Sequence, residues 1–127
     1  MYSKDAGGIS WIDLTVDNAD QVQKFYQSVI GFKSKAFPMG NYNDYVLTSP
    51  IDPDKSFGVC HAKGTNSGLP AQWLLYFNVD DINKSIQQCI ELGGSVIKEK
   101  SETDDYYMCV IKDPAGAVVA LIENKDN

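Results

Sequence analysis

The sequence predicts an α+β fold in which two tandem βαβββ modules form a curved mixed sheet around a shared cleft. One observation is an order of expected elements (strand, helix, strand, strand, strand) that occurs twice in 127 residues. A second is a near-constant offset: Val16 and Val79 end the first strand of each copy, 63 residues apart, and Ile30 and Leu92 end the two helices, 62 apart. A third is a Gly- and Pro-rich segment between the copies, residues 64–71.

The first copy begins at residues 9–16, whose β-branched and aromatic side chains are typical of a strand. Asp17 or Asn18 can cap the helix that follows, and Gly31 ends it. The apolar side chains of that helix recur at spacings that put them on one face: Phe25, Tyr26, Val29 and Ile30. Three more strands are expected, at 32–37, 42–48 and 56–62.

The second copy repeats this order. Asp80 or Asp81 can cap its helix, and Gly93-Gly94 ends it. The apolar stripe of this helix consists of Ile82, Ile86, Cys89 and Ile90. Its four strands are expected at 72–79, 95–98, 106–111 and 117–123.

We expect a single domain over residues 1–127, made of modules at about 1–63 and 72–127 that are joined by the linker 64–71. Each module is too small to cover its own sheet. If both helices lie outside, the concave faces of the two half-sheets enclose a cleft in which a small molecule binds. A plain α+β sandwich with a filled core is the alternative.

The composition restricts the partners. Seventeen acidic residues against eleven basic ones give a net charge of −6, and no segment carries a basic run. Nucleic acid and anionic membranes are therefore excluded as expected partners, because binding them depends on Lys and Arg. The acidic excess suits a cationic ligand, although an acidic surface also simply keeps a protein in solution.

The three cysteines, Cys60, Cys89 and Cys109, are an odd number without a CxxC motif, which argues against a disulfide framework or a thiolate zinc site. No apolar run of signal-peptide length follows the N-terminus, and no stretch approaches the length of a membrane span. We therefore expect a cytoplasmic protein with reduced thiols.

Several segments together resemble the vicinal oxygen chelate superfamily, which includes glyoxalase I, extradiol dioxygenases and bleomycin-resistance proteins. In the first copy they are Val16-Asp17, Phe25-Tyr26 and Ile30-Gly31-Phe32. In the second copy they are Phe77-Asn78-Val79-Asp80-Asp81-Ile82, Glu91-Leu92-Gly93-Gly94, Asp113-Pro114-Ala115-Gly116 and Leu121-Ile122-Glu123. The resemblance covers nearly the whole chain and implies the fold described above and a homodimer.

The departures from the family pattern concern the metal. Members that hold a divalent metal usually carry a His five residues before the Val of the first strand, and the resemblance puts Trp11 and Leu74 at that place in the two copies. They usually carry a Glu four residues after the Gly of Asp-Pro-x-Gly, where this chain has Ala120. None of these three side chains can donate to a metal, so we expect neither a metal nor another cofactor.

His61 is the one imidazole of the chain, so proton transfer near neutral pH falls first to it, with Asp13 as its partner. Strand alternation puts Asp13 on the face of Trp11. If the strand at 56–62 aims Val59 and His61 into the cleft, the two polar groups approach each other. A relocated metal would then have two ligands, fewer than the three of a typical catalytic site. The alternative is that His61 is a partly exposed strand residue.

The candidate ligand-binding residues are Trp11, Asp13, His61, Gln72 and Tyr76. Tyr76 takes the place of Asp13 in the second copy. Trp11 and Trp73 open the two repeated strands and form either an aromatic clamp or parts of the core. Cys60 directly precedes His61, which disfavours a Cys-His dyad.

Three functions are compatible with these residues. The first is a metal-free protein of the glyoxalase/bleomycin-resistance type that binds a small, cationic or aromatic molecule. The second is a glyoxalase-like lyase or isomerase that uses a relocated metal or acid–base chemistry by His61 and Asp13. The third is a non-catalytic dimeric scaffold. Whether the protein is an enzyme stays open at this point.

Overall fold

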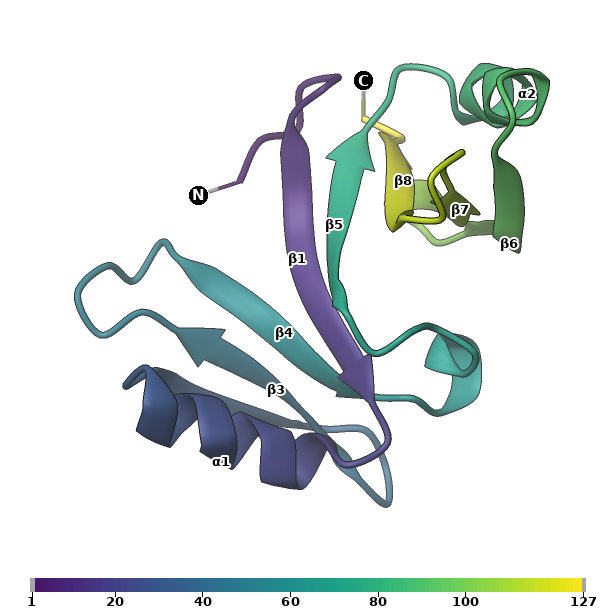
Figure 1. The fold of residues 1–127 in the computed structure, drawn as a ribbon. Coiled ribbons are helices and arrows are strands. Elements are labelled where there is room, and N and C mark those ends of the chain that lie inside the picture. The colour runs from purple at the N-terminus through teal and green to yellow at the C-terminus, as the bar shows by residue number, and fades with distance from the viewer. Residues whose placement is uncertain (1, 127) are drawn as a thin grey trace. The chain divides into compact units, whose positions relative to one another are not determined.

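The computed structural model describes residues 2–126 (Figure 1). The first half contains β1 (Ile9–Val16), α1 (Ala19–Val29), β2 (Lys33–Pro38), β3 (Asn43–Thr48), β4 (Ser56–His61) and the short 3₁₀ helix η1 (Gly64–Asn66). The second half contains β5 (Trp73–Asn78), α2 (Ile82–Glu91), β6 (Ser95–Glu102), β7 (Tyr106–Lys112) and β8 (Val118–Asn124). The strands follow the order β2-β3-β4-β1-β5-β8-β7-β6. The α+β class and the two βαβββ modules are therefore confirmed, whereas the shared cleft stays a prediction.

The chain forms two compact units. Unit 1 comprises Ile12–Trp73, and unit 2 comprises Tyr2–Trp11 together with the described residues from Leu74 onward. The first residues of β1 thus belong to unit 2. Just before β1, the carbonyl oxygen of Gly8 accepts the backbone N–H of Asn78. The single-domain organisation with modules at 1–63 and 72–127 stays a prediction.

In unit 1, α1 covers one face of the strands β3 and β4 (Figure 1). The core beneath it is formed by Ala19, Leu47 and Val59, each with no exposed surface. β4 pairs in parallel with β1 and antiparallel with β3. Burying this apolar cluster supplies the main free energy that holds the helix on the sheet.

In unit 2, α2 packs on the face of the sheet that carries Cys109 and Leu121, with Ile82 of the helix buried between them. The Asp81 carboxylate accepts the backbone N–H of Lys84 and caps the helix, as the sequence indicates. Gly93 has a φ of 96° and ends the helix in the left-handed conformation that glycine adopts without strain.

The outer strands differ most from the sequence expectation. β6 extends to Glu102, four residues beyond the expected end, and its pairing with β7 shifts register twice. Its second half is charged and exposed, so it shows none of the apolar alternation that identifies strands. Lys33, Lys35 and Pro38 in β2 and Lys98 and Lys100 in β6 disfavour pairing of these edges with another chain.

Over residues 2–126, neither α1 nor α2 has the length and apolar character that a membrane-spanning helix needs.

Candidate functional site

His61 lies at the end of β4 and is 5% exposed. Its Nδ1 lies 2.7 Å from the carbonyl oxygen of Asn43, and its Nε2 lies 3.8 Å from Oδ2 of Asp20, at the start of α1. The ring of Tyr42 meets the imidazole edge-on at 5.2 Å. The imidazole is therefore held on the face of the sheet that α1 covers.

Asp13 lies on the opposite face. In the parallel pairing of β1 with β4, Val16 stands beside His61 and Asp13 stands beside Gly58. Side chains three residues apart in a strand point to opposite faces. The expected Asp13–His61 pair is therefore not formed, because Val59 and His61 point towards α1 and not towards the open face. His61 is also buried and not partly exposed, so the alternative prediction for it was wrong as well.

The face of unit 1 opposite α1 is unusually polar for a sheet face. Asp13 and Thr15 of β1 lie there, beside Gly58 and Cys60 of β4. Thr15 is buried and Asp13 is half-buried. Further along, the hydroxyls of Thr48 and Ser56 lie 3.1 Å apart in a hydrogen bond. Buried polar side chains need hydrogen-bond partners, so this face suits a polar ligand better than an apolar one.

The pKa of the Cys60 thiol reflects the charges on this face. Burial raises the pKa of its thiol, and the carboxylates of Asp13 and Asp44 raise it further. Two carboxylates on one thiol make this a region of negative potential, which favours a cation. The thiol stays protonated at neutral pH, and its strand neighbour His61 points to the other face, so a Cys-His nucleophilic pair is absent here.

The corresponding face of unit 2 is apolar. Tyr76 stands beside Ala120 in the β5–β8 pairing, and Val110 of β7 stands on the other side of Ala120. Leu74 shares this face by alternation, and all four side chains are buried. Tyr76 is thus a buried residue of this apolar face, and its expected role in ligand binding stays a prediction.

The remaining expected site residues lie as follows. Trp11 is half-buried, with its indole edge-on to Tyr2 at 5.8 Å. Gln72 is half-buried just before β5. Trp73 packs under α1, where its Nε1 donates to the hydroxyl of Tyr26 at 3.2 Å and its ring lies 6.0 Å from that of Phe57. Trp73 is therefore a core residue of unit 1 and not one side of a clamp.

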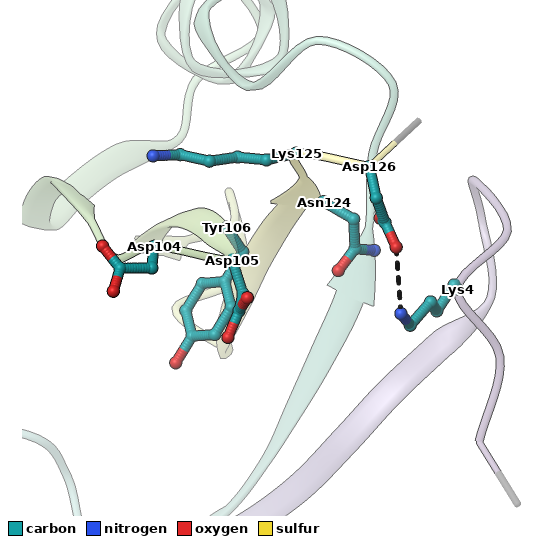
Figure 2. Close-up of a pocket in the computed structure, with 7 residues that line it drawn as sticks. All are labelled: Lys4, Asp104, Asp105, Tyr106, Asn124, Lys125 and Asp126. Carbon is teal, nitrogen blue, oxygen red and sulfur yellow. Dashed lines mark hydrogen bonds and ion pairs between the residues drawn. The ribbon is translucent and has the colours of Figure 1, made fainter.

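Unit 2 also carries a surface pocket of about 530 Å³ (Figure 2). It is lined by Lys4, Asp104, Asp105, Tyr106, Asn124, Lys125 and Asp126. Lys4 pairs with Asp126 at 3.2 Å, and Lys125 pairs with Glu102 beyond the pocket, so neither cation points freely into it. A second, polar hollow lies at the start of α2, where Glu123 accepts the backbone N–H of Ile82. The lysines that line the two hollows, Lys4, Lys125 and Lys100, each already have a partner.

Sequence reasoning missed the residues around His61. Asp20, Asn43 and Asp44 come from a helix and a strand far from β4 in sequence, so only the tertiary fold brings them to the imidazole. One signal was present: Phe57 and Val59 alternate with the small Gly58 and Cys60, which indicates that the odd-numbered residues of β4 face the helix.

Comparison with known proteins places the chain in a family. A model of the glyoxalase/bleomycin resistance protein/dioxygenase superfamily matches residues 8–121. The chain belongs to this superfamily. Its fold is similar to that of the methylmalonyl-CoA epimerase from Mycobacterium tuberculosis, with a TM-score of 0.56 and 15% identity over 97% of this chain and 92% of the other.

Curated superfamily relatives are longer proteins. "Putative glyoxylase CFP32" of Mycobacterium tuberculosis is 26% identical over 94% of this chain and 45% of its own length. "Anthracycline biosynthesis protein DauV" of a Streptomyces species is 24% identical over 94% of this chain and 42% of its own length. The chain thus spans about half the length of these relatives.

The metal that many superfamily members hold does not fit the residues present here. The positions that the resemblance equates with metal ligands carry Trp11, Leu74 and Ala120. In the strand pairing, Gly58 stands beside Asp13 and Ala120 beside Tyr76. The indole of Trp11, the alkyl side chains of Leu74 and Ala120 and the hydrogen atom of Gly58 donate no electron pair to a metal. Among the described residues, no group of three or more His, Cys, Asp or Glu side chains is arranged to hold a metal ion.

Proposed function

We propose that this superfamily member binds a planar, cationic small molecule without a metal, on the face of unit 1 opposite α1. The observation that carries the proposal is the half-buried carboxylate of Asp13 on this polar face, where it stands beside Gly58 and also raises the pKa of the half-buried Cys60 thiol. A half-buried carboxylate such as Asp13 forms stronger ion pairs than an exposed one, because less water screens it. In this proposal Gln72, which also belongs to unit 1, contributes a contact to the ligand, and His61 does not.

The donor chemistry supports the metal-free form, because the superfamily ligand positions carry Trp, Leu and Ala. Acid–base catalysis by an Asp13–His61 pair has no support, since the two side chains point to opposite faces. A lyase or isomerase with a relocated metal on the open face would need three donors there, whereas Asp13 is one carboxylate and that of Asp44 accepts the backbone N–H of His61. Binding without chemistry is therefore the function that these residues support best.

The relatives named for anthracycline biosynthesis suggest a probe. Doxorubicin is an anthracycline with a flat ring system and an ammonium group, and its aglycone lacks that group. We expect saturable quenching of doxorubicin fluorescence by the protein, with about tenfold weaker binding of the aglycone because the ion pair is lost. Asp13→Asn should weaken doxorubicin binding by a similar factor and leave the aglycone unaffected.

Asp17→Asn is the matched control, because it removes the same charge from an exposed position just after β1. It should change the affinity less than about twofold, since an exposed charge is screened. Equal effects of the two substitutions, or no saturable binding of doxorubicin or of the cationic dye ethidium, would contradict the proposal.

Homodimerisation and a cytoplasmic location with three free thiols are further parts of the proposal. Because the edges of β2 and β6 disfavour pairing, we expect the dimer to use the exposed apolar side chains of α1, Phe25 and Val29, which are 56% and 62% exposed.

Light scattering should therefore give about twice 14.0 kDa for the protein. Val29→Asp should shift the mass to that of the monomer, because it places a charge in the apolar contact. Ile51→Asp is the control, since Ile51 is 92% exposed in a loop and should leave the dimer intact. A monomeric wild-type protein at micromolar concentration would refute this part of the proposal.

A further inference from the structure

The surroundings of His61 form a second arrangement, on the face of unit 1 that carries α1. The imidazole is buried, yet its Nε2 reaches towards Asp20, whose side chain is 68% exposed. The gap between Nε2 and Oδ2 of Asp20 is 3.8 Å, which is too long for a hydrogen bond. The pair thus joins a buried imidazole nitrogen to a carboxylate at the surface.

The hydrogen bond at the other ring nitrogen fixes the tautomer. A backbone carbonyl only accepts, so the contact of 2.7 Å to Asn43 requires the proton to be on Nδ1. In the neutral ring, Nε2 then presents its lone pair to the Asp20 carboxylate. Two electron-pair donors facing each other repel, and a cation between them removes the repulsion.

The carboxylate is held in place as well. The hydroxyl of Tyr45 donates to Oδ1 of Asp20, which leaves Oδ2 turned to His61. This hydrogen bond is the main cause that raises the pKa of Tyr45, so the phenol remains a donor. A backbone carbonyl on Nδ1 and a hydroxyl on the carboxylate are the outer contacts that orient metal ligands in proteins.

We infer that Nε2 of His61 and Oδ2 of Asp20 form a site for a divalent transition metal such as Zn²⁺. Two metal–ligand bonds of about 2.1 Å span up to about 4.2 Å, so one ion fits the gap after a small rotation of Asp20. Imidazole with carboxylate suits zinc, nickel and copper. Water or a small anion completes the coordination, because no third His, Cys, Asp or Glu of the described residues is arranged to join these two groups.

The other charged groups nearby favour a cation. The Asp44 carboxylate lies 3.7 Å from Nδ1, so two carboxylates flank the imidazole. The Lys63 ammonium, by contrast, lies over the ring of Tyr42 at 4.8 Å from its centroid. The site is distinct from the proposed ligand face, because Asp13 lies on the other side of the sheet.

Nuclear magnetic resonance of the imidazole nitrogens tests this site directly, since the untagged chain contains one His. Before metal is added, Nε2 of the neutral ring should carry no proton. Zn²⁺ should then shift the Nε2 signal saturably with one equivalent bound. We expect a dissociation constant between about 1 μM and 1 mM, because two protein ligands hold the ion less tightly than the four of a structural zinc site.

Asp20→Asn should weaken Zn²⁺ binding at least about tenfold, because it removes a charged ligand from an exposed position where folding is not at risk. Asp17→Asn is the matched control and should change the affinity less than about twofold. His61→Asn keeps a donor for the Asn43 carbonyl and should abolish the binding.

A proton on Nε2 of the neutral ring, no Nε2 shift up to about 1 mM Zn²⁺, or equal effects of Asp17→Asn and Asp20→Asn would each overturn the inference. Doxorubicin binding by Asp20→Asn should equal that of the wild type, which separates this site from the proposed function.

Discussion

Gly94→Ala should destabilise the protein by about 3 kcal/mol and lower its Tm by roughly 10 °C. A Cβ at this position would lie 2.7 Å from the carbonyl oxygen of Lys112 and 2.7 Å from Sγ of Cys89. The sulfur can move, but the carbonyl belongs to β7, so the substitution forces β6, β7 and α2 apart. Urea unfolding of both proteins measures the difference.

Two further variants isolate the cause. Gly94→Ala combined with Cys89→Ala should regain only part of the stability, because the contact with Lys112 remains. Gly40→Ala meets no atom within 4 Å, so it should show only the strain of its φ of 96°, about 1 kcal/mol. If Gly94→Ala lowers the free energy of unfolding no more than Gly40→Ala does, the close approach of residue 94 to β7 and the end of α2 is contradicted.

Asn78→Asp should destabilise the protein by about 3–5 kcal/mol at pH 8, because it places an unpaired charge at a position that is 2% exposed. The Asn78 amide donates to the carbonyl of Ser3 at 2.6 Å, and its oxygen accepts from the amide of Asn124 at 3.1 Å. A carboxylate can accept from Asn124 but faces the Ser3 carbonyl without a proton to donate.

The loss should depend on pH in a defined direction. Burial raises the pKa of an introduced carboxyl above its value of about 3.9 in the unfolded chain. Below that value the acid is protonated in both states, and its hydroxyl can replace the amide donor, so the loss is small. As the pH rises towards the folded-state pKa, the unfolded state ionises first and the loss grows.

Urea unfolding at pH 5 and pH 8 should therefore show a much larger gap between variant and wild type at the higher pH. Asn41→Asp is the control, since Asn41 is an exposed turn residue. A gap that is equal at both pH values would show that the carboxyl at position 78 is solvated, and would contradict the buried network between Ser3, Asn78 and Asn124.

The sequence was sufficient to predict where most helices and strands lie, because the patterns that identify them involve neighbouring residues. The strand expected at 9–16 has these bounds in the structure. The expected apolar stripe of α1 is only partly right, because Tyr26 packs on the core whereas Phe25, Val29 and Ile30 are exposed. The end of β6 was missed because an exposed edge strand need not alternate. The repeat offset also correctly equated Asp13 with Tyr76, since each stands beside a small residue on the parallel neighbour strand.

The candidate site was harder to predict from the sequence, because it depends on which face of the sheet each side chain of a strand points to. A shift of one residue turns every side chain of β4 to the other face, and the local signal for its orientation is the short alternation of large and small side chains at 57–60. The buried Val59 decides it, since Val59 packs under α1 and His61 follows two residues later. Asp20 and Asp44 reach His61 only through the folded chain, so no spacing in the sequence could predict them.

The central claim is that the ligand binds without a metal, and one titration tests it most directly. The protein is dialysed against EDTA, checked by elemental analysis, and titrated with doxorubicin beside an untreated sample. We expect less than about 0.1 equivalent of transition metal after dialysis, since the His61–Asp20 site exchanges its ion, and the same doxorubicin affinity in both samples. Binding that is lost with EDTA and restored by one equivalent of Ni²⁺ or Zn²⁺ would contradict the account.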